Sequence, residues 1–366
     1  MVFELRGGWG VKVNETIEAM RNQWKSMTSM AGMFLTTILL GITIQPVWDM
    51  PQARAFGEEG TTQGGYILLE LVLIGIFTFV IIWLARKNFE MFIKIFVMFS
   101  LYFSLFYVVA PYIALIMQIT LGTQENVAII ALVLNLLLMI TLWRFPEWYI
   151  VNFVGVLVGS GVITMIGISF VPTLIIIFMI CAAIYDHWAV NGSKHMLELA
   201  DTMIDLKLPI LLVAPKEKGY SFLDEQEGVM EKTIEKPTQE DWDDPKIKPI
   251  KVEKGGRDAL FMGLGDVIFP GMLVISTITF LPETGVVLGS LPLTSFFGWI
   301  HLDPLLVGLG TLAGGLLGYL GLMTQVAKGK PQAGLPLLNG GSILGYLITG
   351  FIVYGPSELI QQITLF

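Results

Sequence analysis

Long, uninterrupted apolar stretches recur along the chain, and they constrain its fold more than any other feature. Most are about as long as a helix needs to cross a bilayer, which takes ~20 residues. A soluble domain covers its surface with charged groups, which make up about 25% of its residues. Here only 14% of residues are charged and 54% are hydrophobic. We therefore expect most of the chain to lie in a lipid bilayer.

Helices are the expected form of these stretches, because open strands leave backbone groups unpaired in lipid. The stretches are also longer and more uniformly apolar than strands of a membrane β-barrel. The sequence predicts an all-α polytopic membrane protein with about nine transmembrane helices. Their expected limits are 27–47, 66–84, 91–117, 126–143, 148–168, 171–190, 258–281, 302–322 and 334–354.

The chain is expected to have three parts. Residues 1–190 form an N-terminal part with six helices, residues 191–257 a long polar loop that is partly disordered, and residues 258–366 a C-terminal part with three helices. In the loop, residues 194–207 have apolar residues at helical spacing, which predicts an amphipathic helix on the membrane surface. Two further loop segments, 210–213 and 247–253, have strand-like patterns.

Basic residues predict the orientation, because cytoplasmic loops carry an excess of lysine and arginine. If the N-terminus is cytoplasmic, every basic residue except Arg54 lies on the cytoplasmic side or at its membrane edge. The inverted orientation would reverse this distribution. We expect a multi-pass protein of the cell membrane with a cytoplasmic N-terminus, an external C-terminus and a cytoplasmic 191–257 loop.

Few side chains are available for a metal or a disulfide. Cys181 is the only cysteine, and the chain has three histidines, whereas a structural zinc site uses about four cysteine or histidine ligands. The net charge of -8 gives no indication of nucleic-acid binding. We expect no metal, no organic cofactor and no nucleic-acid partner.

Carboxylates within the membrane need an explanation, because a charge in hydrocarbon is costly. The predicted helices contain three candidates, Glu70, Asp186 and Asp266. Glu70 lies near an interface and is better explained by snorkelling or a hydrogen bond. Asp186 and Asp266 are expected ~6 Å and ~12 Å below the cytoplasmic edge. An extension of the sixth helix into the loop would bring them to one depth.

Two facing aspartates suit acid–base hydrolysis. The ionised carboxylate can take a proton from water, while its protonated partner polarises a peptide carbonyl. Gly263 and Gly265 would let a substrate backbone approach Asp266. The residues alone leave a proton-coupled transporter or an ion-leak channel open. However, no internal repeat typical of transporters is evident, and the polar groups cluster in the cytoplasmic half instead of lining a full path.

Three short motifs surround these aspartates in a fixed order. They are Tyr185-Asp186, Gly263-Leu264-Gly265-Asp266 and Gly334-Leu335-Pro336. These resemble the YD, GxGD and PAL motifs of the presenilin and signal-peptide-peptidase family of intramembrane aspartyl proteases. The chain looks like an archaeal-type presenilin homologue, and the resemblance covers essentially its whole length.

The resemblance implies that Asp186 and Asp266 are the catalytic pair and that substrates are transmembrane segments of other membrane proteins. It implies that Leu335 and Pro336 lie beside the pair and shape the site. We also expect Tyr185, Gly263, Gly265 and Gly334 to shape the site or contact the substrate. The family motif usually reads Pro-Ala-Leu-Pro, whereas this chain has Ala333-Gly334-Leu335-Pro336, so the roles of the first two family residues do not carry over. Neither an accessory subunit nor an oligomer is indicated.

A substrate helix must be unwound before it is cut, because a helix hides its carbonyls in hydrogen bonds. The freed backbone groups then need partners, which an exposed strand supplies by β-augmentation. Of the two strand-like loop segments, 247–253 is the expected template because it leads into the helix that carries Asp266.

Overall fold

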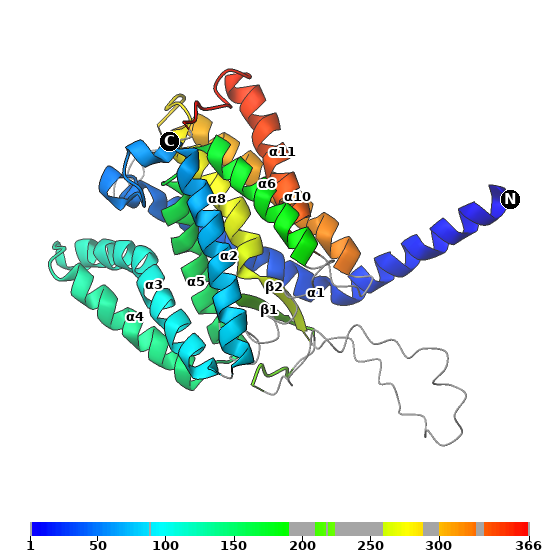
Figure 1. The fold of residues 1–366 in the computed structure, drawn as a ribbon, viewed down its shortest axis with the longest axis horizontal. Helices are drawn as coiled ribbons and strands as arrows, with labels where there is room; N and C mark the ends of the chain where they lie inside the picture. The colour runs from blue at the N-terminus through cyan, green and yellow to red at the C-terminus, as the bar shows by residue number, and fades with distance from the viewer. Residues whose placement is uncertain are drawn as a thin grey trace.

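The computed structural model describes residues 2–87, 89–189, 209–216, 219–223, 259–287, 300–326 and 333–364. Within these residues, nine α-helices form a bundle with a small two-stranded sheet at one end (Figure 1). Seven helices are long and apolar enough to cross a membrane. The prediction of a polytopic membrane protein built from helices is confirmed, and the small sheet is the one addition to the predicted all-α fold within these residues. The helices are α1 (Val2–Trp48), α2 (Gly64–Arg86), α3 (Glu90–Leu121), α4 (Val127–Arg144), α5 (Trp148–Gly167), α6 (Pro172–Trp188), α8 (Leu264–Phe280), α10 (Leu302–Val326) and α11 (Leu335–Tyr354).

The first and seventh predicted helices begin at the wrong residues. Helix α1 starts at Val2 instead of residue 27, although its apolar part is only Gln23–Trp48. The prediction missed the earlier turns because it followed apolar length, and a helix can continue beyond the membrane. Helix α8 starts at Leu264 instead of residue 258.

The residues before α8 form a strand. Strand β2 (Ala259–Gly263) pairs antiparallel with β1 (Leu211–Pro215), with Val213 opposite Phe261. A short apolar run suits either a helix or a strand, and here pairing with β1 selects the strand. Strand β1 overlaps the strand-like segment predicted at 210–213, whereas the predictions for 194–207 and 247–253 lie outside the described residues.

Glycines let α10 and α11 pack backbone against backbone. A Cβ atom at Gly314 would overlap the carbonyl oxygen of Gly341, and one at Gly345 would overlap that of Gly310. Small residues four apart allow this close approach of membrane helices. The contact fixes α11, which carries the third sequence motif, beside α10.

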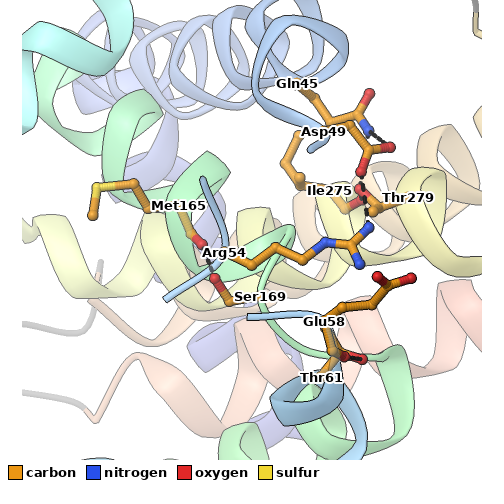
Figure 2. A network of polar contacts seen from close by, with 9 residues as sticks. All are labelled: Gln45, Asp49, Arg54, Glu58, Thr61, Met165, Ser169, Ile275 and Thr279. Carbon is orange, nitrogen blue, oxygen red and sulfur yellow. Dashed lines mark hydrogen bonds and ion pairs between the residues drawn. The ribbon is translucent and has the colours of Figure 1, made fainter. Parts of the chain in front are cut away.

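The two ends of the bundle differ. We call the end with β1 and β2 the sheet side and the other end the loop side. On the loop side, the α1–α2 connection is held by polar contacts (Figure 2): Arg54 pairs with Asp49 at 3.1 Å, and Gln45 donates to Asp49 and to Thr279 of α8. The Ala55 N–H also donates to Ser169, just after α5. These contacts tie the connection to the ends of α5 and α8.

Candidate active site

Asp186 lies in the last turn of α6 and is almost completely buried. Its side chain is on the sheet side of the bundle, and the residue is only 6% exposed. The backbone N–H of Leu335 donates to Asp186 Oδ2 at 3.2 Å. Leu335 is the first residue of α11, and first-turn N–H groups have no acceptor within their own helix. The start of α11 therefore supplies a donor to this carboxylate.

Asp266 lies in the first turn of α8. Gly263 is the N-cap residue of this helix, and a Cβ atom there would lie 3.6 Å from Asp266 Oδ2, so the carboxylate lies beside the N-cap. An acidic side chain three residues after the N-cap commonly lies in this position. The next N–H, of Leu264, donates to the carbonyl of Ile210 at 2.8 Å. The strand pair thus leads directly into the turn that positions Asp266.

Both aspartates meet the same short segment at the start of α11. A Cβ atom at Gly334 would lie 2.8 Å from Asp266 Oδ2, while the adjacent Leu335 N–H binds Asp186. Consecutive residues of one segment therefore lie against the two carboxylates. Because α8 begins at Leu264, Asp266 lies only ~3 Å along the helix from its start. The expected mismatch in depth therefore disappears without an extension of the sixth helix.

Some of the other motif residues lie against the two carboxylates, and others have free space around them. Gly263, Gly334 and Leu335 lie against the carboxylates, and Pro336 follows in the first turn of α11. A Cβ atom at Gly265 would meet no described residue within 4 Å, so this part of the chain leaves room for a substrate backbone there. Tyr185 is 38% exposed, and its ring lies 6.1 Å from that of Trp188.

Asn339 belongs to the surroundings of the site but was not predicted. Its Nδ2 donates to the carbonyl of Met179 on α6 at 2.9 Å, one turn beyond Leu335 on α11. This bond holds α11 against α6 next to the contact with Asp186. Among the described residues, the buried Oδ1 of Asn339 has no partner. The available signal was a lone amide in an apolar helix four residues after Leu335.

Asn152 fixes the sheet to the bundle. Its side chain, on α5, accepts from the N–H of Val213 at 2.8 Å and donates to the carbonyl of the same residue at 2.7 Å. Ser26 of α1 adds a bond to the carbonyl of Pro215. Strand β1 is therefore bound by two helices along the edge that faces away from β2.

The chemistry available here is that of two carboxylates and backbone N–H groups. Within the described part of the chain, no three histidine, cysteine, aspartate or glutamate side chains gather as metal ligands. Two carboxylates that lie close together do not ionise together readily, and such a pair can hold one proton between them. Such a pair can both accept and donate a proton during one reaction.

Comparison with known proteins gives a consistent result. Two solved structures of a presenilin family intramembrane aspartate protease resemble this one. The structure in space group P2 is 26% identical, has a TM-score of 0.53, and matches over 88% of this chain and 97% of the other. The structure in space group C222 is 24% identical, with a TM-score of 0.52 over 89% and 97%.

No curated protein gives a significant match, and none of the findings supports a transporter. The family model described as "Signal-peptide peptidase, presenilin aspartyl protease" matches residues 31–355, which is most of the chain. The chain therefore belongs to the signal-peptide peptidase and presenilin family of intramembrane aspartyl proteases.

Proposed function

We propose that Asp186 and Asp266 are the catalytic pair of this protease and that they activate water to cut peptide bonds in transmembrane segments. The observation that carries this proposal is their convergence on Gly334 and Leu335. The ionised carboxylate takes a proton from water as the water attacks the peptide carbonyl. The protonated carboxyl donates to the carbonyl oxygen, where negative charge develops.

The neighbours of the pair have positioning roles in this proposal. The N–H of Leu335 orients Asp186 through its hydrogen bond. The absence of a side chain at Gly334 leaves space for the Asp266 carboxylate, and the open space at Gly265 receives the substrate backbone. Pro336 restricts the backbone at the start of α11. Tyr185 lies at the exposed edge of the site, next to Asp186 in the chain.

Water reaches the pair because both aspartates lie at the ends of short helices. Helices α6 and α8 each have 17 residues, which corresponds to ~25 Å. The apolar part of a bilayer is about 30 Å thick. The terminal turns with the aspartates are on the sheet side, where β1 and β2 bring polar backbone groups to the membrane edge.

The sheet side is the cytoplasmic side in this proposal. The protein is then a multi-pass protein of the cell membrane with its N-terminus inside and its C-terminus outside. The basic residues at the sheet-side ends of α2 and α4, Arg86 and Arg144, agree with this orientation. Substrates would have their N-terminus outside. We retain the division into residues 1–190, 191–257 and 258–366 as the organisation of the chain.

Strand β2 has the better edge for holding an unwound substrate. The N–H and carbonyl of Val213 point away from β2, since Asn152 binds both. In an antiparallel pair of strands, two opposite residues either bond each other through both backbone groups or both direct these groups outward. Phe261, opposite Val213, therefore directs its N–H and carbonyl to the outer edge of β2. Among the described residues only β1 pairs with β2, so the outer edge is the proposed template.

Substitution of the two aspartates tests the catalytic assignment. Asp186→Asn and Asp266→Asn each remove one ionisable group with little change in volume, and each should abolish cleavage of a transmembrane peptide by the purified protein. The double variant should be no worse than either single one, because the two groups act as a unit. The matched control, Asp303→Asn at the loop-side start of α10, should retain activity.

Thermal unfolding should show that all these variants are folded. Cleavage by the wild type should be blocked by a hydroxyl-bearing mimic of the tetrahedral intermediate. Substantial cleavage by either folded single variant would exclude the proposed pair.

A further inference from the structure

An apolar groove lies between α3 and α4, the helix pair at one edge of the bundle (Figure 1). Its volume is about 380 Å³. One wall is a stripe of α3 and the other a stripe of α4, both at helical spacing. The residues that line it are Met98, Phe99, Tyr102, Leu136, Met139, Ile140 and Trp143.

Basic side chains continue both walls toward the sheet side. Lys94 is one turn before Met98 on α3, and its Nζ lies 4.8 Å from the ring centre of Trp143, over the ring face. Arg144 is four residues after Ile140, so it extends the same face of α4 and is exposed. One end of the groove therefore carries two positive charges.

The other end of the groove is closed. The hydroxyl of Tyr102 donates to the carbonyl of Leu132 at 3.3 Å and bridges the two helices. Lys94 and Tyr102 are eight residues apart, so the open length is ~12 Å. The nearest acidic group in the α4–α5 turn, Glu147, is already bonded to Ser221 and to the N–H of Phe222.

An anionic phospholipid has the chemistry that these features require. Lys94 is the fifth residue of α3 and Arg144 is the last residue of α4, so both lie near the depth of lipid headgroups. Basic pockets between transmembrane helices bind anionic headgroups, whereas a zwitterionic headgroup gains less from the two charges. The apolar walls accept part of one acyl chain, which alone would not distinguish one lipid from another.

We propose that the α3–α4 groove is a binding site for one anionic phospholipid of the sheet-side leaflet. Its phosphate pairs with Lys94 and Arg144, and one acyl chain lies along the groove as far as Tyr102. The bound lipid adds contacts between α3 and α4 to the direct ones that Tyr102 makes with Leu132 and Lys94 makes with Trp143. Helix α5 lies between this pair and α8 (Figure 1), so the lipid site is separate from the two aspartates.

Lipid binding to the purified full-length protein tests the proposal. Native mass spectrometry should show at least about tenfold tighter binding of phosphatidylglycerol than of phosphatidylcholine. Lys94→Gln should weaken phosphatidylglycerol binding about fivefold, the effect expected for one basic residue near a membrane surface. Lys25→Gln is the matched control, because Lys25 also lies over a tryptophan, at 6.0 Å, but that residue is Trp24 of α1, whereas Lys94 lies over Trp143 of the groove wall.

A second variant examines the groove without changing its charge. Leu136→Trp should fill the space and reduce phosphatidylglycerol binding, while thermal unfolding in detergent without lipid stays near that of the wild type. If Leu136→Trp does not fold, Lys94→Gln and Lys25→Gln still decide the question. Equal weakening by these two lysine variants, or equal binding of the two lipids, would overturn the proposal.

Discussion

Gly334 is one of two positions at which this chain departs from the family motif, which usually has alanine there. The backbone at Gly334 is helical, with φ -78° and ψ -43°, so any L-residue can adopt it. What constrains the position is the contact with Asp266, because a Cβ atom would lie 2.8 Å from Oδ2. Glycine at position 334 therefore leaves more space for the Asp266 carboxylate than alanine would.

Substitution at Gly334 should affect activity in proportion to side-chain size. Gly334→Ala displaces only the end of the Asp266 side chain, and a ~30° rotamer change costs about 1 kcal/mol, or roughly fivefold in kcat. Gly334→Val leaves Asp266 no comparable adjustment and should abolish cleavage. Gly340→Ala is the control on the same helix, because its Cβ would meet nothing within 4 Å. A Gly334→Val enzyme with wild-type kcat would show that this contact is unimportant.

At the level of single residues, the sequence predicted the charged members of the site but not the amides around them. Asp186 and Asp266 were recognisable because a buried carboxylate is costly in a membrane and each lies in a motif. Asn339 binds a backbone carbonyl of α6, a partner that no sequence pattern reveals. Asn152 binds the backbone of β1, and that strand lies beside α5 only in the folded chain.

At the level of secondary structure, the existence of each helix was predictable from apolar length, whereas the start of α8 was not. Residues 259–263 are as apolar as the helix that follows. Their strand conformation depends on β1, which is far away in sequence. The six-residue error mattered for the site, because it placed Asp266 too deep by about 9 Å.

The outer edge of β2 can be tested with two substitutions at one position. Phe261→Pro removes an outward N–H, and proline is tolerated at a strand edge because no bond to β1 is lost. Phe261→Ala removes the same side chain, including its ring contact with Phe222, but keeps the N–H. If β2 pairs with substrate, cleavage by the proline variant should fall tenfold or more below that of the alanine variant.

Thermal unfolding and detergent extraction should be similar for the two Phe261 variants. Equal cleavage rates would mean that the β2 edge does not hold the substrate, although the catalytic pair could still be correct. A loss of stability in Phe261→Pro alone would show that the strand pair itself had been disturbed.

At the level of the whole molecule, the membrane architecture can be predicted from composition, whereas the assembly of the site from three helices cannot. Nine apolar segments predict nine helices, and small residues four apart allow the close packing that α10 and α11 show in the structure. The meeting of α6, α8 and α11 at their sheet-side ends depends on contacts across long sequence separations. Leu335 and Asp186, for example, are 149 residues apart. Only the resemblance between motifs indicated this meeting in advance.

The orientation of the whole molecule decides from which side water and substrate reach the aspartates, and it can be measured directly. In a Cys181→Ser background, cysteines at Leu223, next to the sheet, and at Glu58, in the α1–α2 connection, lie on opposite sides of the bundle. Because basic residues flank the sheet-side ends of the helices, a membrane-impermeant thiol reagent added to intact cells should label Glu58→Cys. Leu223→Cys should be labelled only after the cells are opened. The reverse pattern would place the aspartates near the external face, and would exclude substrates with an external N-terminus.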